Sequence, residues 1–510
     1  MSFRSSFRRL SCESEGMILG AATLRNLEIL NNQTDGGLKG SLLWVLDHTR
    51  TSFGKRLMRN WVSQPLTHPQ SLSERQDAVQ EILESPSLTL SSIKSLLSHL
   101  PDLERGICSI YHKKCSTQEF YLISSGLSRL GLELQALLPA IQSQISSALL
   151  RGLLLDTPDL LAPAHSHLKV LNEKAAKSGN KTELFSDLSG FPVLQERREQ
   201  IQTVINEIQD HRKEVRLTLK TPALDYTSVS GQEFLIEVKN LRSSTVPPDW
   251  VKISSTKAVG RYHSPLLVER YKKLLQLREQ LLLDCQKEWT NFLDQFGEHY
   301  HTMKRAISHL ATMDCLFSLA EVAKQGDYCR PEVCEGQRQI MIRDGRHPAI
   351  DLLMGDHNQY VPNLTELQVH VKALTLFVTH YPPLCELERV YPEHVSNFHM
   401  AFLLNEPDIN TDDGEVQPEF VTFLYQLTEG AAGRSYGLNV ARLVDIPVPI
   451  LHTAARKARE LENTVNARRR TKKLLSDLLS ISDRSSLMAW LQSDSSLVQH
   501  QENTQPAISE

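Results

Sequence analysis

Two long segments with an apolar residue at every seventh position bracket a stretch of alternating residues in the middle of this chain. The first runs from Val193 to Leu219, and its repeating residues are Leu194, Ile201, Ile208 and Val215, with Val204 and Ile205 on the same stripe. The second repeats Leu275, Leu282, Trp289 and Phe296, with Tyr271, Cys285 and Phe292 in an intervening row that Arg278 interrupts. A narrow seam of this period needs one partner helix. The sequence therefore predicts two long helices that pair antiparallel.

Between these helices the period changes to two. Phe234, Ile236 and Val238 alternate with Glu233, Leu235, Glu237 and Lys239, which is the pattern of a half-exposed strand. A Pro-Pro turn and further strand-like residues follow, up to Tyr262. We expect a small β-module at the tip of a helical arm about 40 Å long, at ~1.5 Å per residue over roughly 27 residues.

The β-module contains the candidate DNA-binding residues of the chain, which are Lys239, Arg242, Lys252, Lys257 and Arg261. Its acids nearly balance them, and these are Asp225, Glu233, Glu237 and Asp249. Taken alone, such a module is a solvated charged hairpin. Presented on an arm, it could instead close over a duplex and contact phosphates. The charges leave both alternatives open.

The rest of the chain predicts an all-α region followed by a mixed α/β region. With 510 residues it is too long for one compact core, and three or four domains are expected. Helical patterns extend from Thr23 to about Leu161. Residues 339–342 resemble a strand, and the apolar run Leu374–Val378 resembles a strand buried on both faces.

The C-terminal region from Pro447 to Leu479 is helical and basic, and a polar tail follows it. The fold class predicted for the whole chain is mainly α with α/β. Its formal net charge is -4, so any DNA-binding surface must be local or shared with a partner.

Cysteine usage and hydropathy indicate a soluble protein in a reducing compartment. No apolar run approaches the roughly 20 residues of a membrane helix, so no membrane association is expected. The 8 cysteines are scattered, which favours the nucleus or cytosol. Cys108, His112 and Cys115 lack a second ligand pair at zinc spacing, as do Cys329 and Cys334, so buried free thiols are favoured and no metal site is predicted. The arginine-containing start of the chain faintly resembles a transit segment, but a frayed arm is favoured.

Several segments, in order along nearly the whole chain, resemble the MutS family of mismatch-repair ATPases. In the first half these are Thr23–Ile29, Leu46–Thr51 leading through Gly54 to Trp61, Pro65–Leu66, Arg75, Asp77–Val79, Pro101–Arg105 and Gly231–Lys239. In the second half they are Gly345–Pro348, Tyr360–Asn363, Phe377–Tyr381 and Arg434–Ala441. No single segment is specific, but the ordered set is. Cys108–Cys115 and Gly326–Pro331 are most similar to the branch of eukaryotic MutS homologue 3.

The resemblance implies a division into domains and a function. The implied divisions are an arm (1–22), a helical core (23–164), lever helices (165–222 and 264–304), a DNA clamp (223–263), a truncated P-loop-type ATPase domain (305–446) and a C-terminal helical dimerisation region with a polar tail (447–510). It also implies DNA mismatch repair in the nucleus on duplexes with insertion/deletion loops. The implied partners are MutS homologue 2, as heterodimer partner, and downstream repair factors; the implied cofactors are ATP and magnesium.

Two departures from the family pattern limit what the resemblance implies for this chain. The chain starts at the core, so we expect it to lack the mismatch-reading domain. It also contains no G-x-x-x-x-G-K-[ST] string, and no Asp-Glu dipeptide ends an apolar strand, although nucleotide hydrolysis by this family uses both. The apparent junction lies between about Glu366 and Lys372. No catalytic residue is therefore predicted.

Two residues are candidates for a remnant of the ATP site. Tyr360 matches a position whose ring stacks on adenine, and ordinary packing explains it equally well. His380 matches a histidine near the terminal phosphate, but a histidine that ends a buried strand is the favoured explanation. Ser435 and Tyr436 match a segment near the nucleotide at the family's dimer interface.

Three hypotheses follow. The first is a partner-dependent DNA clamp subunit without its own ATPase activity, and the second is an active ATPase. The third is a purely structural coiled-coil protein, or a truncated isoform that is non-functional or only competes for the partner. The missing phosphate loop argues against the second hypothesis. The basic tip between lever helices favours the first over the third, whereas loss of central sheet strands favours the third.

Overall fold

A computed structural model describes residues 16–84, 87–326, 328–334, 339–355, 360–368, 375–380, 382–405, 420–432 and 436–480. The chain divides into two units. The first extends to Cys334 and also includes Pro348–Leu353, and the second contains the remaining residues. Each unit is described by itself.

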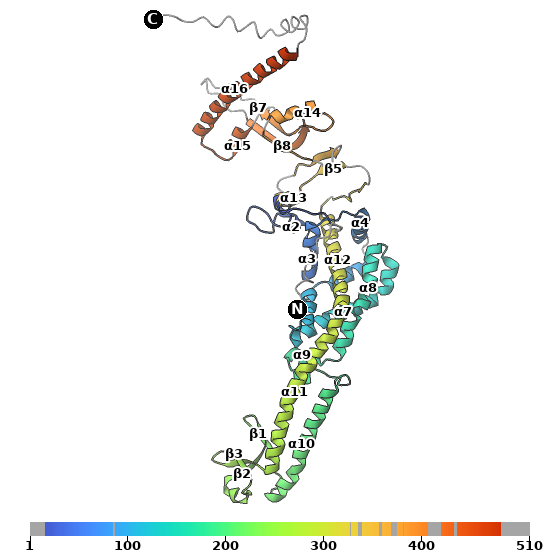
Figure 1. Ribbon diagram of the computed structural model, residues 1–510, viewed down its shortest axis with the longest axis vertical. Helices are drawn as coiled ribbons and strands as arrows, with labels where there is room; N and C mark the ends of the chain where they lie inside the picture. The colour runs from blue at the N-terminus through green and yellow to red at the C-terminus, as the bar shows by residue number, and fades with distance from the viewer. Residues whose placement is uncertain are drawn as a thin grey trace, which may run out of the picture. The chain divides into compact units, whose positions relative to one another are not determined.

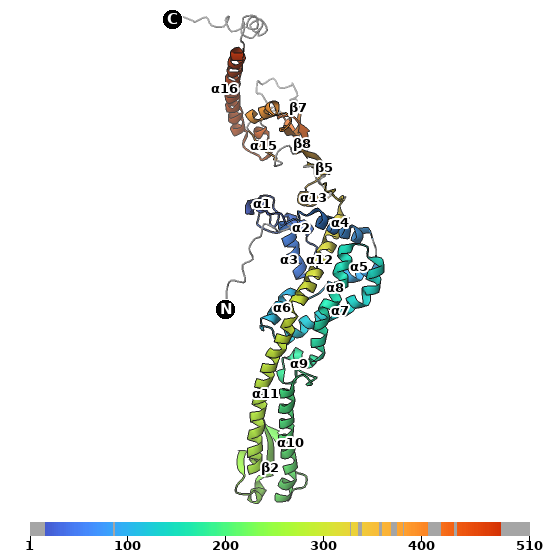
Figure 2. The same ribbon diagram turned by 45° about the vertical axis from the view of Figure 1, so that its right-hand side comes forward.

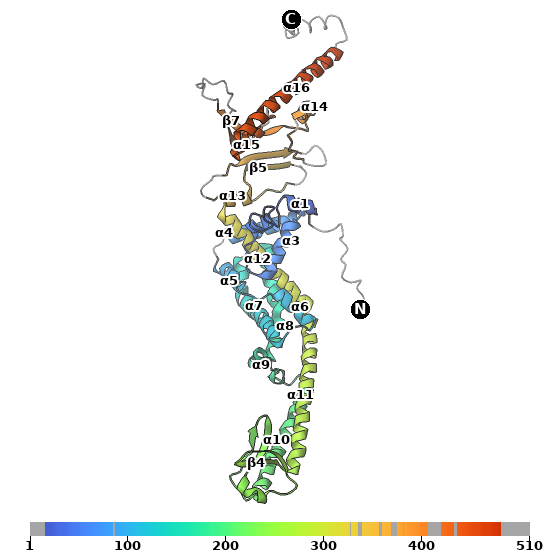
Figure 3. The same ribbon diagram turned by 90° about the vertical axis from the view of Figure 1, so that its left-hand side faces the viewer.

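Most helices in the core of the first unit begin at a residue whose side chain caps the first turn. At the start of α7 (Thr117–Gln144), the Ser116 hydroxyl accepts from the Glu119 N–H, and the Glu119 carboxylate accepts from the Ser116 N–H, which satisfies two unpaired donors at once. The other core helices are α1 (Ala21–Asn26), α2 (Leu42–Leu46), α3 (Ser52–Ser63), α4 (Pro69–Glu84), α5 (Leu88–Leu96), α6 (Leu103–Tyr111), α8 (Ala148–Lys169) and α9 (Glu173–Ser178). Figure 3 shows α9 at the end of the α7–α8 pair, where the long helices start.

The centre of this core is an aromatic cluster around Phe120 of α7. Its side chain is 0% exposed. Its ring lies 5.4 Å from Trp289, 5.3 Å from Phe292 and 4.9 Å from Phe296, measured between ring centroids. All three partners belong to α11 (Pro265–Glu298). The base of a lever helix is therefore part of the core.

Helix α12 (Tyr300–Gln325) runs through the same core. The ATPase domain was expected to begin at 305, but this helix continues without a break from Tyr300 and buries Ile307, Leu310 and Leu316 in the first unit. The boundary expected at 305 therefore does not coincide with the division between the two units. By length and composition α12 could cross a membrane, but 67% of the window that passes this test is buried within the protein, as is usual for an apolar helix in the core of a globular domain.

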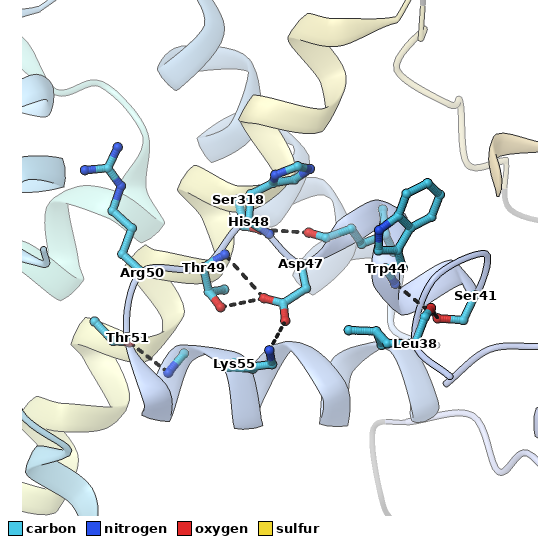
Figure 4. A network of polar contacts seen from close by, with 12 residues as sticks. Leu38, Ser41, Trp44, Asp47, His48, Thr49, Arg50, Thr51, Lys55 and Ser318 are labelled. Carbon is cyan, nitrogen blue, oxygen red and sulfur yellow. Dashed lines mark hydrogen bonds and ion pairs between the residues drawn. The ribbon is translucent and has the colours of Figure 1, made fainter. Parts of the chain in front are cut away.

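Two polar side chains of α12, Asp314 and Ser318, fix the loop that precedes α3, and Figure 4 shows Ser318 beside this loop. The buried Asp314 carboxylate accepts from the backbone N–H groups of Arg50 (3.0 Å) and Thr51 (2.9 Å). The Ser318 hydroxyl accepts from the His48 N–H (2.7 Å) and donates to the Leu46 carbonyl (2.7 Å). Burial raises the pKa of Asp314, and the hydrogen bonds from the loop oppose that rise.

The close approach of α3 to α12 requires a glycine at position 54. A Cβ atom there would lie 2.2 Å from Asp314 Oδ2 and 2.8 Å from Thr51 Oγ1. This stretch carries part of the family resemblance, and its role in the structure is helix packing. It forms no phosphate loop, although Gly54-Lys55 is the nearest string to one.

The two lever helices, α10 (Pro192–Thr218) and α11, pair antiparallel as predicted. Arg197, near the start of α10, pairs with Asp284 in the second half of α11 at 2.9 Å. Glu207, further along α10, pairs with Arg270 near the start of α11 at 3.1 Å. Figures 1 and 2 show the two helices side by side, with the clamp strands at their far end.

The predicted apolar row of α11 is wrong in its outer half. Leu275 and Leu282 are 44% and 56% exposed, whereas Leu267 and Leu274 are fully buried. A straight helix rotates by about 20° per heptad away from a strict seven-residue repeat, so one row cannot face the same side over 34 residues. The buried face passes from Leu274, beside α10, to Trp289 in the core.

The second unit contains two separate hairpins. Strand β5 (Gln339–Gly345) pairs antiparallel with β6 (Asn363–Gln368), and β7 (Phe398–Asn405) pairs antiparallel with β8 (Phe420–Glu429). The Asn363 side chain links the hairpins, because its Nδ2 donates to the Tyr425 carbonyl at 3.1 Å. The helices of this region are α13 (Pro348–Met354), most of which belongs to the first unit, α14 (Leu387–Val390), α15 (Gly437–Leu443) and α16 (Val448–Ser480).

The buried strand predicted at Leu374–Val378 is not present in the described part of that segment. Leu374 lies outside the described residues, and Leu376, Phe377 and Val378 form no strand and are 74%, 73% and 93% exposed. Strand β6 ends at Gln368 and already pairs with β5, and a parallel neighbour would need a crossover of a dozen or more residues. All strand pairs in the described residues are antiparallel.

The junction near residue 370 should be the most protease-sensitive part of the chain. We expect early cleavage beyond the end of β6, at Lys372, while the first unit up to Lys324 stays intact, because the apolar residues Leu376, Phe377 and Val378 are exposed and have no sheet partner. Limited trypsin digestion followed by mass spectrometry measures this. Initial cleavage within α10, at Arg212 or Arg216, with the junction uncut would contradict it. Residues 369–374 lie outside the described residues.

Candidate nucleic-acid interface

The clamp is a four-stranded antiparallel sheet in the order β1-β2-β4-β3. Its strands are β1 (Thr227–Val229), β2 (Gln232–Lys239), β3 (Val251–Ser255) and β4 (Val259–His263), and the short helix η3 (Asn240–Thr245) follows β2. Ile236 and Val238 of β2 are buried against the tips of the lever helices, as the alternation predicts. Leu235, which was predicted on the exposed face, is also buried, so the half-exposed pattern is wrong at that position. This apolar cluster fixes one face of the sheet to the levers and leaves the rest of the module at the end of the arm.

Polar contacts also join the clamp to the levers. Arg278, which interrupts the apolar row of α11, donates two hydrogen bonds to the Glu233 carboxylate of β2, each at 3.0 Å. The Tyr226 hydroxyl donates to the Ile208 carbonyl of α10 at 3.1 Å. The arginine that looked out of place in the sequence is therefore a link between α11 and the sheet.

Lever arginines neutralise two of the clamp's four acids. Glu233 pairs with Arg278, and Asp225 pairs with Arg212 of α10. The hydrogen bond from Arg212 lowers the pKa of Asp225, so this carboxyl stays ionised and paired. Within the sheet, Glu237 pairs with Arg261 at 2.7 Å. Asp249 is the clamp acid that forms no ion pair with the described residues.

Four of the candidate DNA-binding residues are left without an acidic partner among the described residues. Lys239, Arg242, Lys252 and Lys257 are all exposed. Acidic and basic residues are nearly equal in number in the sequence of the module, but the side chains left unpaired at its surface are mostly cations. This could not be predicted from the module's own sequence, because two of the three neutralising arginines, Arg212 and Arg278, belong to α10 and α11.

Three of the four cations lie at the same end of the sheet. The Asn240 side-chain amide donates to the backbone carbonyls of Thr256 (3.0 Å) and Lys257 (2.9 Å), so the start of η3 is tied to the turn between β3 and β4. Lys239 directly precedes this asparagine, and Arg242 follows two residues later. Asn240 was not among the predicted site residues, and a polar residue between two cations is only a weak signal for such a role.

Lys252 and Arg261, the remaining two of the five candidates, lie elsewhere. Lys252 pairs in register with Tyr262 on β4, on the face of the sheet that turns toward the levers, at the edge strand. The Arg261 side chain is 15% exposed and its guanidinium contacts Glu237. The structure thus groups Lys239, Arg242 and Lys257 and separates Lys252 and Arg261 from them.

The remnant nucleotide residues do not form a comparable site. Tyr360 is half-buried and His380 is exposed, and neither side chain forms a hydrogen bond or ion pair with the described residues. Tyr436 packs on Phe402 with ring centroids 4.4 Å apart, whereas Ser435 lies outside the described residues. A cavity of about 280 Å³ lies instead in the first unit, lined by His48, Arg50, Lys94, Asp314, Phe317 and Glu321, and the ion pair between Lys94 and Glu321 at 2.9 Å occupies part of its wall.

The cysteines were expected to be buried thiols and not metal ligands. Among the described residues, no group of three or more His, Cys, Asp or Glu side chains is arranged to hold a metal ion. Cys115 is buried, and burial raises its pKa to about 11. Cys329 and Cys334 are exposed, so the prediction that they are buried thiols is wrong; their Pro-containing segment lies on the surface.

Comparison with known proteins agrees with this architecture. The family model described as MutS domain III matches residues 22–320, and the model of MutS domain V matches residues 362–462. The chain belongs to the MutS family. Members of this family are ATP-dependent, and the first of the two matches covers the helical core, the levers and the clamp.

Individual relatives in the MutS family are DNA mismatch repair proteins. The human protein named DNA mismatch repair protein Msh3 is 45% identical over 95% of this chain and 53% of its own length. The mouse protein of that name is 45% identical over 95% of this chain and 54% of its own length. An Aspergillus fumigatus msh3 protein is 30% identical over 92% of this chain and 51% of its own length. The chain thus spans about half the length of these MutS-family relatives.

Proposed function

We propose that this chain is a DNA mismatch-repair protein of the MutS homologue 3 type, whose clamp binds the backbone of duplex DNA carrying mismatches or insertion/deletion loops. The observation that carries the proposal is the cluster of Lys239, Arg242 and Lys257 at one end of a sheet whose acids are paired, with the exception of Asp249. Unpaired, exposed cations at the tip of a rigid arm are suited to phosphate contacts, which position a protein on a duplex without reading its sequence.

The proposal extends to the location and the protein partners that the family resemblance implies. The chain acts in the nucleus as a heterodimer with a MutS homologue 2 partner, and it interacts with downstream mismatch-repair factors. An overall net charge of -4 supports a partner-dependent DNA complex, because a chain without a general excess of positive charge depends on local basic surfaces such as the clamp tip.

The described residues do not fit ATP with magnesium. A phosphate site in this family needs a glycine-rich loop, a lysine and a hydroxyl at a helix N-terminus, and no part of the 510-residue sequence has that string. Tyr360 and His380 alone cannot neutralise a triphosphate. In this proposal the chain contributes DNA and partner binding and no hydrolysis.

A second candidate function is a regulatory isoform that competes for the partner without supporting repair. The exposed apolar residues Leu376, Phe377 and Val378 favour it, because a domain with such a surface is prone to capture or degradation. The two candidates differ in DNA binding, which the regulatory isoform does not need.

The clamp variant Lys239→Ala/Arg242→Ala/Lys257→Ala tests the proposal. We expect its affinity for a duplex of about 30 base pairs to fall about 10- to 100-fold near 0.1 M salt, because each phosphate contact releases counterions. Fluorescence anisotropy of the full chain measures this. The matched control Lys272→Ala/Lys273→Ala/Lys287→Ala removes the same charge from exposed positions of α11 and should change affinity much less. Equal losses in both variants would contradict a clamp-specific contact.

A further inference from the structure

Leu241 is the most exposed large apolar side chain among the described residues, at 97%. It is the second residue of η3, between Asn240 and Arg242. Single exposed leucines are common and need no explanation by themselves. This one lies within the three-cation end of the clamp, where Lys239 precedes it by two residues and Lys257 is tied to its neighbour Asn240.

The local structure holds this side chain outward. The Asn240 N–H donates to the Ala258 carbonyl at 3.0 Å, and the Asn240 amide bridges to the turn between β3 and β4. The Thr245 hydroxyl donates to the Arg242 carbonyl at 2.7 Å, which closes the end of η3. With both ends of η3 fixed, Leu241 stays at the surface of the clamp tip.

The dimensions of DNA suit this arrangement. The minor groove is about 6 Å wide, its walls are sugars and its rims are phosphates, and proteins often place an apolar side chain there. A leucine flanked by cations on two segments can enter such a groove while the cations reach the phosphates on either rim. The wider major groove, about 12 Å across, takes a helix or ribbon and would leave one rim out of reach.

We propose that Leu241 is a groove-contacting residue, which inserts into the minor groove of the bound duplex between phosphate rims held by Lys239, Arg242 and Lys257. This rests on the proposed DNA-clamp function and deepens it. The contact is apolar, so it adds affinity without releasing counterions, and it makes the clamp sensitive to groove shape, which phosphate contacts alone are not.

The test compares Leu241→Ala with Leu217→Ala, a leucine of the same arm that is 78% exposed at the end of α10. We expect Leu241→Ala to weaken duplex binding about three- to tenfold with an unchanged salt slope, and Leu217→Ala to have little effect. A fluorescent adenine analogue in the bound duplex should respond to the wild-type chain and respond less to Leu241→Ala.

The outcomes separate the two proposals. If the three-cation variant weakens binding and Leu241→Ala changes neither affinity nor the fluorescence response, the groove contact is refuted and the clamp function stands. If neither variant weakens binding, the proposed function itself fails. If Leu241→Ala weakens binding only of a protein partner and leaves duplex affinity unchanged, Leu241 belongs to a protein interface and the groove proposal is overturned.

Discussion

Purified chain is expected to show no magnesium-dependent ATP turnover above background, either alone or with duplex DNA. Phosphoryl transfer in this family depends on backbone N–H groups, a lysine and a metal that together neutralise charge on the transferring phosphate. The sequence has no loop that could supply them, and β6 occupies the residues after Asn363 where that loop would be expected. A coupled assay of ATP hydrolysis across size-exclusion fractions measures this.

Trace contamination is the main confounder of that assay, and variants resolve it. Tyr360→Ala and His380→Ala alter the residues that match the family's nucleotide contacts, and neither should change the background rate. Turnover that co-elutes with the chain and disappears in either variant would contradict the expectation and show a functional nucleotide site.

Replacing Phe120 with alanine should destabilise the first unit by about 3–5 kcal/mol, because it opens a cavity in a core that cannot collapse around it. The ring is fully buried and contacts Trp289, Phe292 and Phe296 of α11. The substitution therefore also loosens the base of a lever helix. Urea unfolding followed by far-UV circular dichroism gives the free energy, since this unit is largely helical.

Leu122→Ala is the matched control for that measurement. It lies on the same helix, and its side chain is 55% exposed, so its cost should stay below about 1 kcal/mol. A loss of stability at position 120 no larger than that at position 122 would mean that the aromatic cluster does not join α11 to the core.

The arm was predictable from sequence because both of its elements have strong periods. The heptad positions Leu194, Ile208 and Val215 are buried in α10, and the alternating Ile236 and Val238 are buried in β2. Periodicity did not predict which face of α11 is buried along its whole length. The buried face moves around the helix, because an α-helix does not repeat in seven residues and because α11 packs on α10 at one end and in the core at the other. Leu275 and Leu282 are exposed for that reason.

The site was only partly predictable, because surface charge depends on long-range pairing. Arg278 is 45 positions from Glu233 in the sequence and yet neutralises it, and no local pattern contains that information. The same applies to Asn240, whose role follows from the neighbouring turn. In the second unit, the apolar run ending at Val378 has the composition of a buried strand, but composition does not supply the neighbouring strands that burial requires.

The salt dependence of duplex binding tests most directly the central claim that Lys239, Arg242 and Lys257 at the clamp tip bind the DNA backbone. Affinity of the wild-type chain and of the three-cation variant is measured from about 50 to 200 mM salt, and log affinity is plotted against log salt. We predict that the slope of the variant falls by about one unit for each phosphate that it no longer binds, whereas the α11 control keeps the wild-type slope. A variant with the wild-type slope and affinity would contradict this claim and leave the clamp a solvated charged hairpin.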